Sequence, residues 1–363
     1  MEAKKKSIFI ALPLWILVFL VILMYSPLTI RFGITSPQYS NVIGDAALKG
    51  ETKVTDIALL GAHDAFSHQI GLFSDVDPAE SGIVKNKAVN AVFKGGLVRV
   101  LKAQKVNATT LLNRGVRYFD VRISYHHDKW YTKHGLIDQE LKYYVGQIYD
   151  FLKDKPKEFI IFDIQHIYLG TKTMNDFMNY FSDITLIKEN LTLDDFLNHT
   201  TSLPLGDLEY IDVQGATHGG IILLLNDDGT ASLNHGRKYY ERGDGESNTK
   251  AIRSKWHNKQ RVQDIIPLID EEANYLKEEV STPYFRVNQA QLTPDYMKRP
   301  IGTLWDWSLI NLAAKSNKAL LNNTNFDEWL KVMPIFMVDF ANSNNGQFNS
   351  RINELMIAYN KAL

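Results

Sequence analysis

The chain has 363 residues, of which 45% are hydrophobic, and its 40 Lys and Arg nearly balance its 41 Asp and Glu. A formal net charge of −1 argues against a nucleic-acid-binding protein, which normally carries a basic face. The complete lack of cysteine excludes disulfides, thiol catalysis and thiolate metal sites. The length suits an α/β barrel built as one unit.

The N-terminus has the pattern of a membrane anchor. Lys4–Lys6 precede an apolar run, Ile8–Tyr25, which as a helix spans about 27 Å at 1.5 Å per residue, close to a hydrocarbon core of about 30 Å. The run is longer than a usual signal-peptide core, and Met24–Pro27 offers no small-residue cleavage site. We therefore predict one uncleaved transmembrane signal anchor in residues 1–30.

Charge flanking the apolar run sets the predicted orientation. Three lysines precede it and one arginine, Arg31, follows it, so the N-terminus is expected inside and the rest of the chain on the extracellular side. Cleavage of the segment would instead give a secreted protein. Residues 31–52 are polar and are predicted to form a stalk or linker, and 53–363 to form the single large domain.

Beyond the linker, short β-rich runs alternate with amphipathic segments, which is typical of a parallel α/β architecture. The predicted strands are Asp56–Leu60, Tyr118–Ile123, Phe159–Ile164, Gly220–Leu225, Tyr284–Val287 and Ile335–Phe340. Two of these, Phe159–Ile164 and Gly220–Leu225, are almost wholly apolar, which favours strands buried on both faces, as in a barrel.

Helical spacing predicts helices over Leu141–Lys153, Ser308–Leu321 and Ser350–Leu363. Residues 68–103 and 227–258 are predicted to be long connections that decorate one face of the barrel. Within the second of them, the Gly-rich stretch Arg242–Glu246 is expected to be a flexible tip.

Charged side chains recur at or just past the carboxyl ends of the predicted strands, the edge that holds catalytic groups in barrel enzymes. They are His63, Asp64, Asp120, Arg122, Asp163 to His166, and Asp339. Each alone has an ordinary explanation, such as a turn cap, a buried ion pair or a structural histidine. Their joint recurrence at strand ends favours a catalytic site.

The motifs that contain these residues resemble the phosphatidylinositol-specific phospholipase C X-domain family, closest to its stand-alone X-domain-containing members. Five motifs are similar and occur in the family's order: Gly61–Ser67, Gly115–Arg122, His134-Gly135, Glu158–His166 and Val338–Phe340. The resemblance spans about residues 52–363. It implies a distorted TIM-type (β/α) barrel and a phosphoric diester hydrolase or lyase that cleaves phosphatidylinositol-type lipids to diacylglycerol and a (cyclic) inositol phosphate.

The resemblance also implies a role for each catalytic residue. His63 is the general base for the inositol 2-hydroxyl, and Asp339 orients it. His134 is the general acid for the departing diacylglycerol oxygen, with Asp64 in support. Arg122 stabilises charge on the phosphate, a task suited to a permanently charged guanidinium.

Arg122 also bears on the question of a metal. The animal signalling members carry an acidic residue at this position, and calcium needs about 6–8 oxygen ligands. A cation here repels calcium and can take its place, so we expect a metal-independent site with no cofactor. Asp120, Gln165 and His166 are then expected on the substrate side of the site.

The chain departs from the bacterial secreted enzymes at two positions. Their late third-strand lysine is replaced by Gln165 or His166, and their inositol-contacting arginine after the strand matching Gly220–Leu225 is replaced by Asn226-Asp227. Two alternatives therefore stay open: a phosphodiesterase for another phospholipid or glycerophosphodiester head group, and a catalytically silent lipid- or partner-binding barrel. The expected partners are a phospholipid and a membrane, with no nucleic acid, for a monomer. His126 and His127 are expected in a surface turn.

Overall fold

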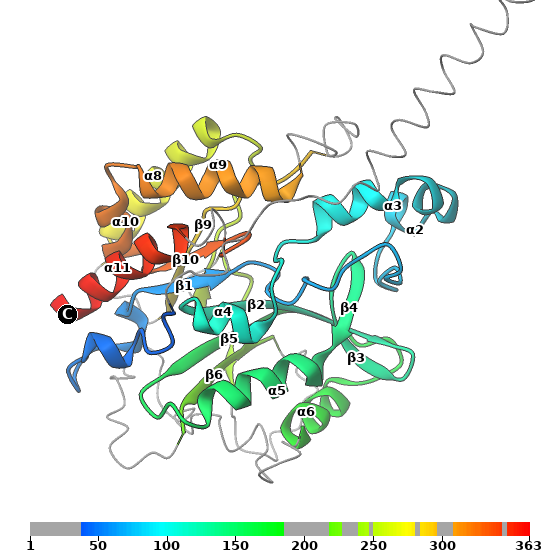
Figure 1. The fold of residues 1–363 in the computed structure, drawn as a ribbon, viewed down its shortest axis with the longest axis horizontal. Helices are drawn as coiled ribbons and strands as arrows, with labels where there is room; N and C mark the ends of the chain where they lie inside the picture. The colour runs from blue at the N-terminus through cyan, green and yellow to red at the C-terminus, as the bar shows by residue number, and fades with distance from the viewer. Residues whose placement is uncertain are drawn as a thin grey trace, which may run out of the picture.

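The computed structural model describes residues 38–184, 218–226, 239–246, 250–279, 284–295, 308–342 and 347–363 (Figure 1). The sheet formed by this part of the chain has ten strands. They are β1 (Leu59–Ala62), β2 (Val116–His126), β3 (Lys129–His134), β4 (Leu136–Glu140), β5 (Phe159–Tyr168), β6 (Gly220–Leu225), β7 (Tyr240–Glu241), β8 (Ile252–Arg253), β9 (Phe285–Gln289) and β10 (Ile335–Val338).

Eight of these strands run parallel in the order β7-β6-β5-β2-β1-β10-β9-β8, and β3 and β4 form an antiparallel extension of β2. The sheet is curled, and its two edge strands approach each other. Ala251 N, next to β8, donates to the Glu241 carbonyl O of β7 at 3.0 Å. The described strands thus form the distorted barrel that the resemblance implies.

Helices cover the outside of the curled sheet. Those after the strands of the first half are α4 (Ala108–Asn113), α5 (Leu141–Leu152) and α6 (Met174–Asp183). Those of the second half are α8 (Val262–Lys277), α9 (Leu309–Leu321), α10 (Phe326–Val332) and α11 (Gln347–Ala362). Figure 1 shows the two groups on opposite sides of the sheet.

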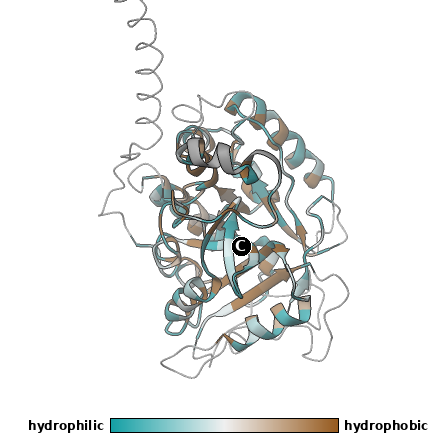
Figure 2. Ribbon diagram, turned by 90° about the vertical axis from the view of Figure 1, so that its right-hand side faces the viewer, coloured by the Kyte–Doolittle hydropathy of each residue, from teal (hydrophilic) through white to brown (hydrophobic). Residues whose placement is uncertain are grey.

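The apolar strands serve two separate cores, which explains why they lack alternation. In β6, Ile222 and Leu224 belong to the cluster inside the curl, whereas Ile221 and Leu223 belong to the cluster between sheet and helices. Both faces of a parallel strand are therefore dry, as this arrangement requires. Figure 2 shows the matching amphipathic pattern of the helices, brown on one side and teal on the other.

The predicted strands and helices are confirmed within a few residues at their ends. β1 differs most: the 3₁₀ helix η2 (Val54–Asp56) occupies the predicted start, and the strand continues to Ala62. A Cβ on Gly61 would lie 2.8 Å from Tyr118 Cδ1, so this glycine permits close packing of β1 on β2.

The prediction of a long connection over residues 68–103 is wrong for the second half of this range. It contains the helices α2 (Gly82–Lys85) and α3 (Lys87–Leu101), and the last turn of α3 buries Leu97, Val100 and Leu101. Gly95-Gly96 interrupts the apolar spacing of this helix in the sequence, and packing of the C-terminal turn overrides the low helix propensity of glycine.

The described part of the predicted linker, residues 38–52, packs on the barrel. It contains the 3₁₀ helix η1 (Gly44–Ala46), and Ile43 is buried in the inner cluster. Ile43 N and Gly44 N donate to the buried carboxylate of Glu158 at 3.1 and 2.8 Å. The domain itself therefore satisfies backbone polar groups of the described linker residues.

No helix among the described residues is long and apolar enough to cross a membrane. The predicted anchor, residues 1–30, lies outside the described ranges.

Candidate active site

The predicted catalytic residues come together at the carboxyl ends of three neighbouring strands. His63 follows β1, Arg122 lies in β2, and Asp339 follows β10. The strand ends are tied by the backbone, since His63 N donates to the Val338 carbonyl O at 3.0 Å and Ala65 N to the Asp120 carbonyl O at 2.9 Å. Because β2 and β10 flank β1 in the sheet, the order of the strands alone brings these residues into contact.

His63 is held by its Nδ1 atom, which lies 2.7 Å from Asp339 Oδ1. Its Nε2 atom faces a possible donor, Arg122 Nη2 at 3.3 Å, and a possible acceptor, Asp64 Oδ2 at 3.2 Å. The neutral ring can accept at Nε2 and the protonated ring can donate there. The surroundings can therefore hold the imidazole in either protonation state, as a group that transfers protons requires.

Asp64 is the central carboxylate of the cluster. Its φ of 39° is left-handed, a conformation that Asp tolerates better than most residues, and its side chain is fully buried. Oδ1 lies 2.8 Å from Arg122 Nε, and Oδ2 lies 3.1 Å from His134 Nδ1. Asp64 thus contacts Arg122 and both imidazoles.

His134 reaches the cluster from the end of β3. Its Nδ1 lies 2.7 Å from the Leu101 carbonyl O, at the end of α3, so this nitrogen carries the proton and Nε2 is left for other partners. Gly135 next to it has φ 66°, and a Cβ there would lie 3.0 Å from Leu101 Cδ1. The two imidazole centroids are 6.0 Å apart.

Three side chains of the cluster are partly open to solvent. The side chains of His63, Arg122 and His134 are 13, 22 and 18% exposed, whereas Asp64 and Asp339 are buried beneath them. The buried carboxylates therefore support a partly exposed surface of two imidazoles and one guanidinium.

The two imidazoles have opposite pKa shifts. Burial lowers the pKa of His63, but Asp64 and Asp339 outweigh burial and raise it to about 9. Burial also lowers the pKa of His134, and burial together with the positive charges of Arg122 and His63 outweighs Asp64, so its pKa is about 4. At neutral pH, therefore, His63 is the charged imidazolium of the pair and His134 is the neutral imidazole.

The carboxylates differ as well. Burial raises the pKa of Asp64, but Arg122 and the two histidines outweigh burial and lower it. Burial raises the pKa of Asp120 to about 6, with a further contribution from Asp64, and Arg122 opposes this shift. Asp64 is therefore the ionised partner of the cations at neutral pH.

The three residues expected on the substrate side have different surroundings. Asp120 is buried, accepts from Asp64 N at 3.2 Å, and lies 3.9 Å from Arg122 Nη2. Gln165 Oε1 accepts from Arg122 Nε at 3.2 Å. His166 is largely exposed and is the register partner of Arg122. Partial burial of its ring lowers the pKa of His166, and the charge of Arg122 lowers it further.

A metal ion could find ligands in this cluster, because donor atoms of His63, Asp64 and Asp120 lie within 4.8 Å of one another. The Arg122 guanidinium, however, lies 3.3, 2.8 and 3.9 Å from these same three side chains, respectively. A divalent cation here would have to displace or oppose a permanent positive charge. The donor set therefore fits Arg122 better than it fits calcium.

Sequence reasoning missed a glutamine that links the strand ends. The amide of Gln104 is buried, and its Nε2 donates to the His63 and Val338 carbonyl O atoms at 2.9 and 3.1 Å. Its Oε1 accepts from Ala341 N at 3.1 Å. Gln104 lies in a segment without periodicity, so no sequence pattern marks it.

The second missed residue is Arg242, which was expected in a flexible tip. Its side chain is buried, and Nε lies 2.5 Å from Asp163 Oδ1. Arg242 N donates to the Leu225 carbonyl O at 3.0 Å, which places this cation at the end of β6. Asn226 stands in place of the inositol-contacting arginine that the resemblance implies. Its side chain accepts a hydrogen bond from Gly243 N at 2.7 Å and donates one to the Gly243 carbonyl O at 3.0 Å.

Comparison with solved structures identifies the class of fold. A structure of phosphatidylinositol-specific phospholipase C from Staphylococcus aureus matches with a TM-score of 0.58 at 16% sequence identity, over 89% of this chain and 99% of that one. This likeness shows the curled parallel α/β barrel of that enzyme. No family model matches the chain.

Sequence relatives lead to the same family. PI-PLC X domain-containing protein 3 of Bos taurus is 34% identical over 121 residues, which are 32% of this chain and 38% of that protein. Variant-surface-glycoprotein phospholipase C of Trypanosoma cruzi is 30% identical over 130 residues, or 33% of this chain and 34% of that protein. The chain is thus a relative of the phosphatidylinositol-specific phospholipase C X-domain family, and it matches little more than a third of the length of these relatives.

Proposed function

We propose that this chain is a phosphodiesterase of the phosphatidylinositol-specific phospholipase C type. The observation that carries the proposal is the joint placement of His63, Arg122 and His134 over buried Asp64 and Asp339. A phosphodiester cleavage needs a base, an acid and a cation around one phosphate. These three partly exposed groups supply them.

In the proposed reaction, neutral His63 Nε2 takes the proton of the inositol 2-hydroxyl. That oxygen forms a bond to phosphorus, the bond from phosphorus to the diacylglycerol oxygen breaks, and His134 gives its proton to the departing oxygen. Arg122 offsets the charge on the phosphate oxygens. Asp339 accepts from His63 Nδ1 and stabilises the imidazolium that forms.

In the proposed starting state His134 is the protonated, cationic imidazole and His63 is neutral. In the free protein the cationic imidazole is His63. The two arrangements contain the same number of protons and exchange without change of pH. A bound phosphodiester anion near His134 raises the pKa of His134, which favours the productive arrangement. The phosphate thus helps to prepare its own general acid.

The proposed substrate is a membrane phospholipid. The apolar run Ile8–Tyr25, with its preceding lysines, supports a single-pass anchor that holds the barrel on the extracellular side. The proposed protein is a monomer. The barrel would then meet its substrate in the same bilayer.

The main alternative keeps the chemistry and changes the head group. It is supported by Asn226, which bonds the Gly243 backbone and occupies the place where the bacterial enzymes have an inositol-contacting arginine. A panel of phosphatidylinositol, phosphatidylcholine and glycerophosphocholine, each with the full chain, separates the two. Release of diacylglycerol from phosphatidylinositol alone supports the proposal, and turnover of another diester alone supports the alternative.

A barrel that binds lipid without turnover would give no product with any diester. The proposal also expects that excess chelator leaves turnover unchanged, since Arg122 supplies the positive charge. Loss of turnover in chelator, restored by Ca²⁺, would overturn the metal-independent form of the proposal.

A further inference from the structure

The turn between β2 and β3 brings two adjacent histidines to one side of the chain. Strand pairing continues to His126 opposite Lys129, so the loop has two residues, His127 and Asp128. Their φ values are 44° and 60°, the left-handed pair of a tight hairpin turn that Asn-Gly usually fills. Neighbouring strand residues normally point to opposite faces. Here the two imidazole centroids lie 3.9 Å apart.

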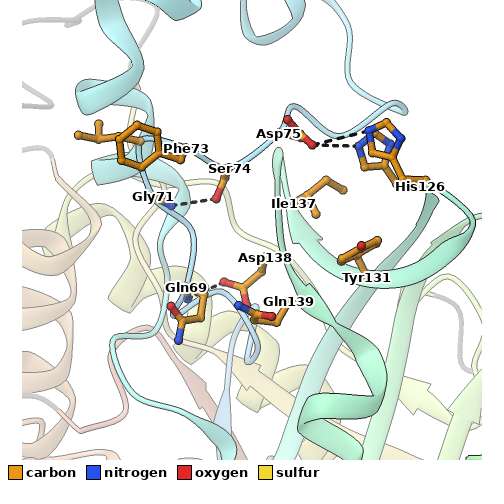
Figure 3. A pocket seen from close by; sticks show the side chains of 12 residues that line it. Gln69, Gly71, Phe73, Ser74, Asp75, His126, Tyr131, Ile137, Asp138 and Gln139 are labelled. Atoms are coloured by element: carbon orange, nitrogen blue, oxygen red, sulfur yellow. Dashed lines mark hydrogen bonds and ion pairs between the residues drawn. The ribbon is translucent and has the colours of Figure 1, made fainter.

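A carboxylate from another segment completes the group. Asp75 Oδ2 lies 3.3 Å from His126 Nε2 and 3.8 Å from His127 Nε2 (Figure 3). Donor atoms of the three residues all lie within 4.8 Å of one another. Tetrahedral zinc with bonds of about 2.0–2.1 Å separates its ligand atoms by about 3.3 Å. The observed spacing is therefore close to that of a metal site.

We propose that Asp75, His126 and His127 bind a divalent late transition metal, Zn²⁺ in the first place. Two imidazoles and one carboxylate are a usual donor set for this ion, and three protein ligands leave one position for water or a small ligand. Asp75 and His127 are 64 and 73% exposed, so the ion can enter from solvent. His126, at 19%, is the more firmly packed ligand.

The group forms one wall of a cavity of about 340 Å³. Its other lining residues come from the loop after β1, from β3 and from β4, among them Gln69, Ser74, Tyr131 and Asp138. Figure 3 shows Asp75 and His126 together on one side of this cavity, with Gln69 and Asp138 on another. The open coordination position would therefore face this pocket, which is itself open to solvent.

The proposed site is separate from the catalytic cluster but lies on segments that support it. Asp75 O accepts from Ile137 N at 2.8 Å, and Asp77 N donates to the Gly135 O beside His134 at 3.2 Å. A metal ion would join the tip of the β2–β3 hairpin to this loop. The expected effect is therefore on the stability of the hairpin and loop, with little change in turnover.

A positive charge nearby limits the expected affinity. The Lys94 ammonium donates to the carbonyl O of Ser74, the residue before Asp75, and its charge attracts the Asp75 carboxylate. Removal of this charge should favour a bound cation. Lys94→Met is therefore expected to tighten Zn²⁺ binding, an effect opposite to that of removing a ligand.

The test is calorimetric titration of Zn²⁺ into the metal-free full chain. We expect one equivalent bound at the wild-type site and at least a tenfold loss of affinity in Asp75→Asn and in His127→Asn. Asparagine favours the left-handed turn conformation, so the second variant removes the ligand without disturbing the hairpin. Zn²⁺ should also raise the Tm of the wild type, and not that of the two variants.

Two controls locate the ion. Asp128→Asn removes a carboxylate from the same turn and should bind Zn²⁺ as the wild type does. His63→Gln disrupts the other group of potential ligands, which consists of His63, Asp64 and Asp120. This variant should also bind one equivalent of Zn²⁺. Absence of binding to the wild type would overturn the proposal, as would binding that survives His127→Asn and is lost in His63→Gln. Neither outcome depends on turnover of any phosphodiester.

Discussion

The His63 imidazole is the residue on which the proposed chemistry depends most. Asp339 fixes one ring nitrogen at 2.7 Å, and the other lies between Asp64 and Arg122. Nearby carboxylates overcome the cost of burial and favour the imidazolium. At His134 burial and two positive charges prevail instead. One environment therefore holds two histidines in opposite charge states, and the proposed reaction starts from the reverse arrangement, with His63 neutral and His134 protonated.

Replacement of either imidazole should remove most of the turnover. General acid or base catalysis typically contributes about 10²–10⁴-fold, so we expect kcat on phosphatidylinositol to fall by about that factor in His63→Gln and in His134→Gln. The exposed His166 is a matched control, and His166→Gln should retain kcat within about tenfold, because His166 is proposed only to contact substrate. Near wild-type kcat in either of the first two variants, with an unchanged circular dichroism spectrum, would refute the assigned roles.

The raised pKa of His63 makes stability depend on pH. The folded state holds a proton up to about pH 9, whereas the unfolded chain loses it near 6.5. The contribution of this proton to the free energy of unfolding is therefore complete below pH 6.5. About 3 kcal/mol of it is lost as pH rises to about 9. Urea unfolding at pH 6.5 and 9 should show this extra loss in the wild type and not in His63→Gln. Equal losses in both proteins would contradict the assignment.

At the scale of elements, the site depends on how β1 and β10 end. At the ends of both strands the Gln104 side chain replaces backbone hydrogen bonds. Its amide donates to the His63 and Val338 carbonyl O atoms and accepts from Ala341 N. Ser67 adds a second link, because its Oγ donates to the Asp64 carbonyl O at 2.7 Å and accepts from Ala103 N and Gln104 N at 3.1 Å. The loop before α4 thus positions His63 and Asp339 without touching the reacting atoms.

Loss of the Gln104 amide should destabilise the strand ends. Gln104→Met keeps the volume but leaves buried backbone groups unpaired, at an expected cost of about 1–3 kcal/mol. The solvent-exposed Gln263→Met in α8 is the control and should change stability by about 0.5 kcal/mol or less. Urea unfolding measures both, and an equal effect of the two substitutions would exclude the positioning role.

Much of the barrel was predictable because its central strands are long and apolar. β5 and β6 stand out in the sequence since both faces are buried, and charged residues just after β1 and β10 and within β2 mark the edge of the candidate site. β7 and β8 were missed because two paired residues leave no periodic signal. Arg242 was missed for the same reason, as it follows β7 in a Gly-rich stretch and its partner, Asp163, lies 79 residues away.

At the scale of the whole molecule, the order of the strands around the curl explains the site. β10, β1 and β2 are neighbours although β10 is the last described strand in sequence and β1 the first. The proposed catalytic residues therefore span from His63 to Asp339 in the chain, and these two still lie within hydrogen-bonding distance of each other. A fragment that ended before β10 would lack the partner of His63 and the strand that pairs with β1.

The most direct test of the proposed function is a turnover assay of the full chain on phosphatidylinositol vesicles in excess chelator. We predict release of diacylglycerol together with inositol phosphate, at a rate that added Ca²⁺ does not increase and that His134→Gln reduces by at least 10²-fold. A folded full chain that releases no diacylglycerol from these vesicles, with or without Ca²⁺, would contradict the proposed function.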